Sequence, residues 1–144
     1  MGVAREMTDE EYRNFLLGSI RTATLATVRA DGRPHTAPIW YHLDDETFVF
    51  MTGESTVKGR NMRRDPRVSL CIDDERPPFH FVIVEGVATL ADGDPDLLRW
   101  ATRIGGRYMG EDQAESFGRR NAVPGELLVR VAPTKVLAYM NIAD

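Results

Sequence analysis

The chain has 144 residues, of which 42% are hydrophobic and 28% are charged, and its formal net charge is −4. This length fits a single domain, residues 1–144, whose core can close without disulfides, and the lone Cys71 excludes an intramolecular bridge. The acidic balance gives no field that would attract nucleic acid. The apolar stretches fall short of the roughly 20 residues that span a bilayer, and the charged N-terminus lacks the hydrophobic segment of a signal peptide. We therefore expect a cytoplasmic protein with neither a nucleic-acid nor a membrane partner.

The first half of the chain predicts a helix, three strands and a second helix. Residues 8–18 begin with Thr8 as an N-cap and carry acidic side chains in the first turn. Residues 22–30 and 35–43 are extended runs on either side of the turn 31–34, and they predict a hairpin. Residues 47–53 are rich in β-branched and aromatic side chains, which indicates a third strand. A short helix within 54–64 is expected to end before Pro66.

The second half predicts further strands around one longer helix. Residues 67–73 form a strand, and residues 79–91 form a long strand in which Gly86 indicates a bulge or a sharp bend. A helix is predicted over 95–110, and the chain ends in one or two strands over 126–141. The segment 105–125 has glycines at both ends and is interpreted as a mobile cover or as a surface loop. About six antiparallel strands with few helices favour a mainly β barrel over a doubly wound α/β sheet.

Hydroxyl groups and cations are concentrated directly after the third strand. Thr52, Ser55 and Thr56 can donate hydrogen bonds, and Lys58 supplies a point charge suited to phosphate. If a helix begins near Ser55, its unpaired backbone N–H groups add to the same anion site. A capped surface helix explains this local pattern equally well.

At this segment the chain resembles the pyridoxamine 5'-phosphate oxidase-like split β-barrel family. The resemblance runs from TATLATVRADGRPHTAPIW through TGESTVKGRNMRRDPRVSL and VEGVATL to ELLVRVAPTKV. It implies a split barrel with a few short helices, and a homodimer that holds its cofactor at the interface. It places Thr52, Ser55 or Thr56, and Lys58 at the cofactor phosphate.

Departures from the family's FMN-dependent oxidases bear on which cofactor is bound. Those oxidases carry further cationic phosphate partners where this chain has Thr36, Tyr41 and Val57. A buried phosphate dianion needs several charge-assisted bonds to offset its desolvation. The chain instead resembles the family's F420-dependent subgroup in its STVK turn and the following RNMRRDPRV. The phosphate and the acidic oligoglutamate tail of coenzyme F420 would then meet the cationic side chains of Lys58, Arg60, Arg63 and Arg64, and Asn61 is also expected to contact the cofactor. The alternative is that the arginines only stabilise the end of the helix, where cations interact favourably with the negative end of the helix dipole.

The resemblance also implies contacts for the cofactor ring and the substrate. Pro38 indicates a place where the strand ladder is open, since proline inside a strand is confined to edges and bulges. Trp40 lies close to Pro38, but core packing is the alternative for Trp40 and Phe50, and an ordinary strand histidine is the alternative for His80. The ring residues are expected to be Ala37, Pro38, Ile39, Phe79 and His80, and the substrate residues Arg107 and Tyr108.

These expectations lead to an F420-dependent oxidoreductase that transfers a hydride between F420 and an unidentified small organic substrate. No serine or cysteine has a base in a recognisable motif, which fits chemistry carried by a cofactor and leaves the catalytic residues unassigned. The three histidines match no compact ligand spacing, so no metal site is predicted. Two alternatives stay open: an FMN-binding oxidase or reductase, and a non-catalytic protein that binds F420 or haem.

Overall fold

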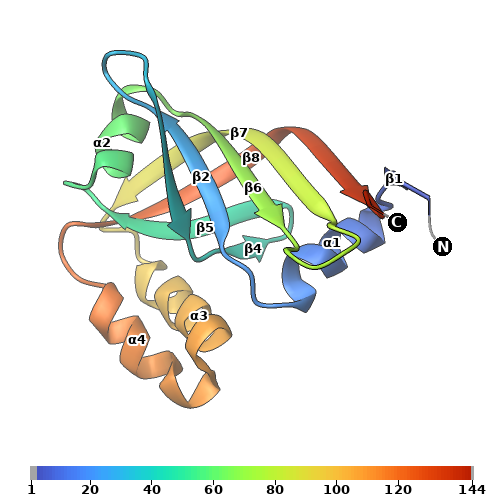
Figure 1. Ribbon diagram of the computed structural model, residues 1–144. Coiled ribbons are helices and arrows are strands. Elements are labelled where there is room, and N and C mark those ends of the chain that lie inside the picture. The colour runs from blue at the N-terminus through green and yellow to red at the C-terminus, as the bar shows by residue number, and fades with distance from the viewer. Residues whose placement is uncertain (1–2, 144) are drawn as a thin grey trace.

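Eight antiparallel strands form one curled sheet in the computed structural model, which describes residues 3–143 (Figure 1). The path across the sheet is β3-β2-β6-β7-β8-β5-β4, and β1 pairs with the end of β8. The fold is therefore a mainly β split barrel, as the sequence predicts. The strands are β1 (Arg5–Glu6), β2 (Ala23–Val28), β3 (Pro34–Ile39), β4 (His42–Asp44), β5 (Thr47–Gly53), β6 (Arg67–Asp73), β7 (Phe81–Asp92) and β8 (Glu126–Met140).

Alternate residues of the strands face the interior and form one hydrophobic core. In a strand, successive side chains point to opposite faces, so a period of two separates core from surface. The 67–73 strand follows this rule, because Val68, Leu70 and Ile72 are buried between more exposed neighbours. Neighbouring strands contribute Leu25, Phe48, Phe50, Val82, Val84, Leu127, Val129 and Val131 to the same core.

Two backbone features predicted from single residues are confirmed. The register between β7 and β8 shifts between Glu85 and Gly86, which is the expected irregularity. A Cβ atom at Gly86 would lie 2.6 Å from the Ala132 carbonyl oxygen, so only glycine permits this close approach. Pro38 lies on β3, at one end of the strand path, where a missing N–H does not interrupt a central ladder.

The predicted strand over 35–43 is two strands. β3 ends at Ile39 and β4 begins at His42, and the chain turns inward between them. Tyr41 is fully buried at this turn, and its hydroxyl donates a hydrogen bond of 2.7 Å to the Leu16 carbonyl oxygen. The turn therefore anchors to the first helix, which the sequence pattern alone did not indicate.

Within the described part of the chain, four α-helices and one short 3-10 helix lie at the rim of the barrel (Figure 1). The first begins with the predicted Thr8 cap, whose side chain accepts from the Glu11 N–H while the Glu11 carboxylate accepts from the Thr8 N–H. No helix within residues 3–143 combines the length and apolar character that crossing a membrane requires. The elements are α1 (Asp9–Gly18), α2 (Val57–Arg64), α3 (Leu97–Met109), η1 (Glu111–Gln113) and α4 (Ala114–Asn121).

The segment interpreted as a mobile cover is instead largely helical. Its first residues belong to α3, and α4 packs along α3 as an antiparallel helical pair (Figure 1). Gly105 faces Phe117 so closely that a Cβ atom would lie 2.6 Å from the Phe117 Cβ, and Gly118 faces Thr102 in the same way. These glycines mark a close helix contact, because they let the two backbones approach each other.

Candidate functional site

Two threonine hydroxyls organise the turn that connects β5 to α2. Thr56 is the N-cap of α2: its Oγ1 accepts from the Gly59 N–H at 3.1 Å and donates to the Gly53 carbonyl oxygen at 2.7 Å. The Thr52 Oγ1 lies 3.0 Å from the Thr56 Oγ1. Since the single hydroxyl proton of Thr56 is used on Gly53, Thr52 is the donor in this pair. Both threonines therefore shape the turn, and neither has a hydroxyl proton left for a ligand.

The donors that remain at this turn lie on neighbouring residues. Ser55 is exposed, and Lys58 is half-buried on the first turn of α2. The N–H groups of Val57 and Lys58 are at helix positions that have no intrahelical acceptor. These groups make a compact set of donors for one anion, in which a lysine provides the charge and the threonines hold the frame.

A cavity of about 220 Å³ opens beside Lys58 and brings predicted residues together. Pro38 and Ile39, expected at the cofactor ring, line it with Lys58, expected at the phosphate. Ala37 precedes them on β3 and is half-buried. The remaining walls come from Trp40, which was expected close to the ring residues, and from four residues that the sequence did not single out: Met51, Ile104, Asn121 and Glu126.

Glu126 is the functional candidate that sequence reasoning missed. It begins β8 directly opposite Gly53, the residue that ends β5, and so faces the turn before α2. Burial raises the pKa of its carboxyl group, while the charge of Lys58 opposes that rise. Only the pairing register of β5 and β8 brings Glu126 near Lys58, which are 68 residues apart in number, so no local motif could have revealed it.

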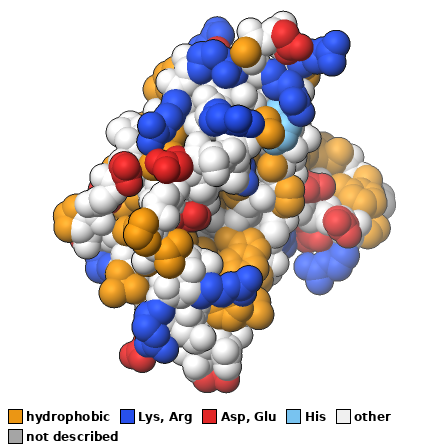
Figure 2. Space-filling view, turned by 90° about the vertical axis from the view of Figure 1, so that its left-hand side faces the viewer, with side chains coloured by type: hydrophobic (Ala, Val, Ile, Leu, Met, Phe, Trp, Pro, Cys, Tyr) orange, Lys and Arg blue, Asp and Glu red, His pale blue; other side chains and the backbone are white. Residues whose placement is uncertain are grey.

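Cationic side chains gather on the other flank of α2. Arg60 and Arg64 line a groove of about 440 Å³ with Arg29, which comes from the turn after β2. Asn61 is buried there, and its amide is engaged at both ends, donating to the Thr27 Oγ1 at 3.0 Å and accepting from Arg64 at 3.0 Å. Figure 2 shows this side of the molecule, with Lys and Arg side chains spread over its upper part.

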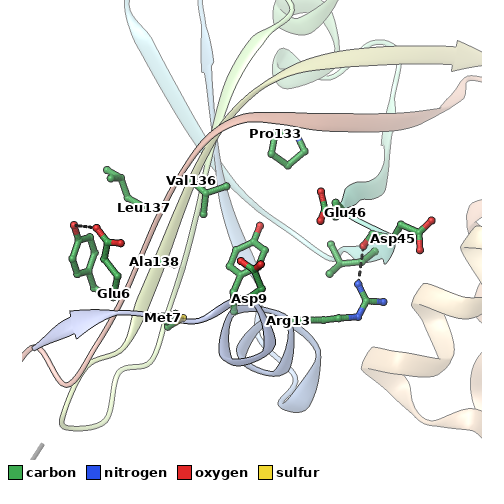
Figure 3. A pocket seen from close by; sticks show the side chains of 13 residues that line it. Glu6, Met7, Asp9, Arg13, Asp45, Glu46, Pro133, Val136, Leu137 and Ala138 are labelled. Carbon is green, nitrogen blue, oxygen red and sulfur yellow. Dashed lines mark hydrogen bonds between the residues drawn. The ribbon is translucent and has the colours of Figure 1, made fainter.

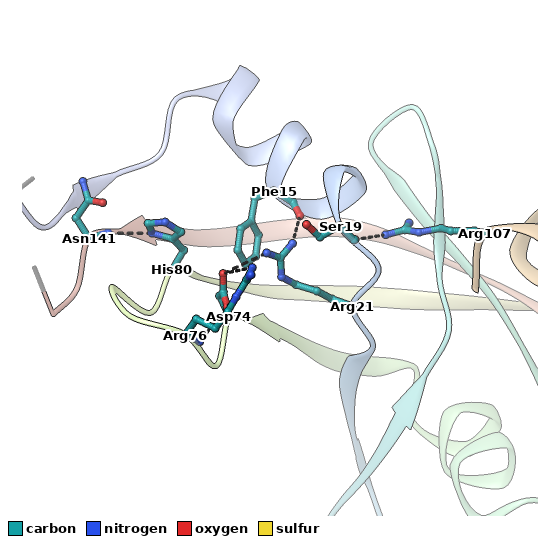
Figure 4. A network of polar contacts seen from close by, with 8 residues as sticks. All are labelled: Phe15, Ser19, Arg21, Asp74, Arg76, His80, Arg107 and Asn141. Atoms are coloured by element: carbon teal, nitrogen blue, oxygen red, sulfur yellow. Dashed lines mark hydrogen bonds and ion pairs between the residues drawn. The ribbon is translucent and has the colours of Figure 1, made fainter. Parts of the chain in front are cut away.

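Phe79 and His80 lie elsewhere in the protomer, in the loop before β7, and the His80 ring lies close to Phe15 of α1 (Figure 4). The His80 Nδ1 accepts a hydrogen bond of 3.0 Å from the Asn141 N–H. The His80 ring packs edge-on against the Phe15 ring, with 6.3 Å between the ring centroids. Phe79 is 42% exposed. One protomer therefore does not bring these two residues to the cavity beside Lys58.

Arg107 and Tyr108, expected at the substrate, connect α3 to the barrel. The Arg107 guanidinium donates to the carbonyl oxygens of Leu16 at 2.7 Å, Tyr41 at 3.2 Å and Ser19 at 3.3 Å. The Tyr108 hydroxyl donates to the Arg21 carbonyl oxygen at 2.6 Å and accepts from the Tyr41 N–H at 3.2 Å. The Tyr108 ring stacks on Trp40, with 4.9 Å between the ring centroids. Trp40 lines the cavity, so Tyr108 reaches the site through this stacking.

A larger cavity, about 470 Å³ in volume, lies between α1, the β4–β5 turn and β8 (Figure 3). Its polar lining is mainly acidic: it contains the carboxylates of Glu6, Asp9, Asp45 and Glu46, and the single cation Arg13. The Arg13 guanidinium donates to the Asp45 carbonyl oxygen at 2.9 Å. This charge repels anions, so the smaller cavity beside Lys58 is the better phosphate site despite its size.

Comparison with known proteins places the chain in one family. The family model for pyridoxamine 5'-phosphate oxidase matches residues 8–139. The chain belongs to this family. A pyridoxine/pyridoxamine 5'-phosphate oxidase of Acidothermus cellulolyticus is 35% identical over 69 residues, which cover 43% of this chain and 31% of that oxidase. The chain thus spans about a third of that relative's length.

Similar solved structures cover most of the chain. The conserved hypothetical protein Rv2991 of Mycobacterium tuberculosis is 29% identical, with a TM-score of 0.81 over 94% of this chain and 86% of that one. A protein described as an F420 reductase is 26% identical, with a TM-score of 0.67 over 85% of this chain and 94% of its own. The chain is thus similar in sequence to a pyridoxine/pyridoxamine 5'-phosphate oxidase and similar in structure to a protein described as an F420 reductase.

The donor set beside α2 fits the phosphate of a family cofactor. One ammonium, one exposed hydroxyl and two backbone N–H groups without an intrahelical acceptor lie on four consecutive residues, 55–58, and the adjoining cavity walls of Pro38, Ile39 and Met51 suit the face of a planar ring. Among the cavity's described lining residues, Glu126 is the one carboxylate.

Proposed function

We propose that this protein is an F420-dependent oxidoreductase acting on a small organic substrate. When bound, the deazaflavin supplies the hydride chemistry, and the protein binds it, orients its ring and excludes water. Lys58 and the first N–H groups of α2 hold the phosphate, Thr52 and Thr56 keep that turn in shape, and Pro38 and Ile39 support the ring. One observation carries the choice of F420 over FMN: among the described residues that line the cavity beside α2, Lys58 is the single cation.

The arginine groove on the other flank of α2 supports the same choice. The oligoglutamate tail of F420 carries several carboxylates, whereas FMN ends at its phosphate. Arg29, Arg60 and Arg64 line a groove of about 440 Å³ next to the helix that carries Lys58. A tail that leaves the phosphate along α2 would meet these cations, and its affinity would fall as salt screens them.

We also propose that two copies of the chain complete the site. Phe79 and His80 are ring candidates, yet they lie near α1 and away from the cavity beside Lys58 in their own protomer. A two-fold dimer brings one protomer's loop to the other's cavity without any change of fold.

Titration of F420 and FMN side by side tests the proposed function. We expect F420 to bind more tightly than FMN, with Lys58→Met weakening F420 by about tenfold or more, the order of one lost charge-assisted contact. Arg99→Met is the matched control, since it removes an exposed cation from α3 that lines no part of the cavity. Unchanged F420 affinity in Lys58→Met would show that the phosphate binds elsewhere, and tighter binding of FMN than of F420 would favour the FMN enzyme.

Mixing two defective variants tests the shared site. Lys58→Met and Phe79→Ala are each expected to weaken F420 binding as homodimers. If each site uses Lys58 of one protomer and Phe79 of the other, re-associated mixtures regain full affinity at about a quarter of the sites, because half the dimers are mixed and one of their two sites is intact. A monomeric protein in sedimentation experiments, or a mixture with no recovered sites, would contradict the shared site.

A further inference from the structure

Lys58 and Glu126 face the same small cavity from two different elements. Lys58 is on the first turn of α2, and Glu126 is the first residue of β8, paired with Gly53 of β5. Gly53 leaves this space open: an added Cβ would lie 3.3 Å from the Thr56 Cγ2 and 3.7 Å from the Glu126 Oε2. The backbone pairing therefore fixes a carboxylate at the site where the ligand phosphate is proposed to bind.

The charges on the cavity wall cancel. Lys58 and Glu126 are the only ionisable side chains among its described lining residues, and Asn121 provides the remaining side-chain amide. Glu54, the next carboxylate along the turn, is half exposed and lies 3.9 Å from Arg63 on the outer side. A singly charged anion can be matched by Lys58 alone, whereas a second negative charge would face Glu126 without a further cation on the wall.

The two candidate cofactors differ in this respect. FMN ends in a phosphomonoester, which carries about −1.5 to −2 charges at pH 7. The phosphate of F420 is a diester that joins the deazaflavin side chain to the lactyl-glutamate tail, and it carries a single charge. The two ligands therefore present different charges to the same wall.

We propose that Glu126 is a specificity-determining residue that disfavours a phosphomonoester and so selects F420 over FMN. This inference rests on the proposed function, because it assumes that the cofactor phosphate lies beside Lys58. Glu126 acts by charge at a fixed position and takes no part in hydride transfer.

Binding titrations of Glu126→Gln with FMN, F420 and riboflavin test the inference. Riboflavin has the FMN ring and no phosphate, so it reports any change in ring binding. We expect the variant to bind FMN about tenfold more tightly than the wild type, the effect of a charge interaction worth one pKa unit. F420 is expected to gain less than FMN, and riboflavin to be unchanged. Glu54→Gln is the matched control, because it removes a carboxylate from the same turn on the outer side, and it should leave all three affinities unchanged.

A second neutral variant, Glu126→Thr, guards against a fold effect, since threonine suits a strand. An unchanged FMN-to-F420 affinity ratio in both variants would overturn the inference, as would a gain for riboflavin equal to that for FMN. Failure of the proposed function is separately visible, because it is the absence of F420 binding to the wild type. If the wild type binds FMN and not F420, the proposed function and the selection of F420 both fail, and a gain for FMN over riboflavin in Glu126→Gln would support only the part of the inference in which Glu126 disfavours a phosphomonoester. A wild type that binds none of the three ligands overturns both proposals.

Discussion

The hydroxyl oxygens of Thr52 and Thr56 lie 3.0 Å apart, and this hydrogen bond joins the end of β5 to the N-cap of α2. Thr52 is almost completely buried, so its hydroxyl depends on this partner. The same Thr56 oxygen also caps the Gly59 N–H. The position of Lys58 is thus set by two hydroxyls that do not themselves reach the ligand.

Thr56→Ala is expected to lower both the stability of the protein and its affinity for the cofactor. Loss of a threonine N-cap costs about 1–2 kcal/mol, and the buried Thr52 hydroxyl loses its acceptor as well. Urea denaturation measures the first effect, and cofactor titration measures the second.

Ser55→Ala separates the two effects, because Ser55 is exposed and has no role in the cap. It should lower affinity while leaving the free energy of unfolding within about 0.5 kcal/mol of the wild type. A stability loss in Ser55→Ala as large as that in Thr56→Ala would show that the turn is held differently.

Gly86→Ala is expected to destabilise the barrel by about 1–3 kcal/mol, the usual cost of overpacking. The new methyl group would meet the Ala132 carbonyl oxygen and the Val131 Cγ1, each at 2.6 Å. The bulge between Glu85 and Gly86 bends β7 at this point, so the strain falls on the centre of the sheet. Thermal unfolding monitored by circular dichroism measures the loss.

Gly18→Ala is the control for this substitution. A Cβ atom at Gly18 meets nothing within 4 Å, and the residue ends α1. The change should be neutral or stabilising by up to about 1 kcal/mol, following the helix propensities of glycine and alanine. Equal losses in the two variants would argue against a specific contact at the bulge.

Local chemistry predicted the features of the fold that depend on a few neighbouring residues. The Thr8 cap, the Gly86 bulge and the edge position of Pro38 each follow from what one residue type permits in the backbone. The interpretation of 105–125 as a mobile cover or a surface loop was wrong, because the glycines at both ends of this segment suggest a loop, whereas Gly105 lies inside α3 and Gly118 lies inside α4. The role of Gly118 as the close contact to Thr102 appears only when α3 and α4 are packed together.

The candidate site also contains residues that could be predicted from neighbouring residues and residues that depend on the tertiary fold. Lys58 and its turn could be recognised from one segment of the sequence, because Thr52, the N-cap Thr56 and the cation Lys58 all lie within the seven residues 52–58. Glu126 and Arg29 reach α2 only through strand pairing and the turn after β2, so their roles depend on the tertiary fold. Thr52 shows a finer limit: the residue was predicted at the site, but the direction of its hydroxyl proton follows from the network around Thr56.

Arg107→Met is expected to destabilise the protein by about 1.5–3 kcal/mol, the range for a hydrogen bond to a charged group. Its guanidinium joins α3 to the carbonyl oxygens of Leu16 and Tyr41, which belong to α1 and to the turn between β3 and β4. Chemical denaturation measures the effect. Arg103, one turn earlier on α3, is exposed, and its guanidinium lies 4.6 Å from the centre of the Trp100 ring. Arg103→Met should therefore lower the free energy of unfolding by only about 0.5–1 kcal/mol. Equal costs would mean that the carbonyl contacts of Arg107 contribute nothing specific.

The stability of the protein should fall in acid partly through Asp74. Its carboxylate accepts hydrogen bonds from Arg76, including its backbone N–H at 2.9 Å, and lies 3.3 Å from Arg21 (Figure 4). The Arg76 side chain is the largest cause of an Asp74 pKa well below the usual range, and the Arg76 N–H adds to it. Because the unfolded chain has the higher pKa, near about 3.9, protons bind the unfolded state first and the contribution of Asp74 is lost as the pH falls.

Asp74→Asn tests this assignment through the pH dependence of unfolding. The variant should be less stable than the wild type at pH 7, and the difference should shrink as the pH falls below about 5, because protons then bind the Asp74 carboxylate of the unfolded wild type and lower the wild-type stability. Urea denaturation at a series of pH values measures the difference, with Glu75→Gln as a control for removing an exposed carboxylate next to it. A difference that stays constant over this range would mean that the Asp74 charge does not contribute to folding. Arg21 would then be held by its two contacts with Phe15: a hydrogen bond of 3.0 Å to the Phe15 carbonyl oxygen, and the position of its guanidinium 4.3 Å from the centre of the Phe15 ring.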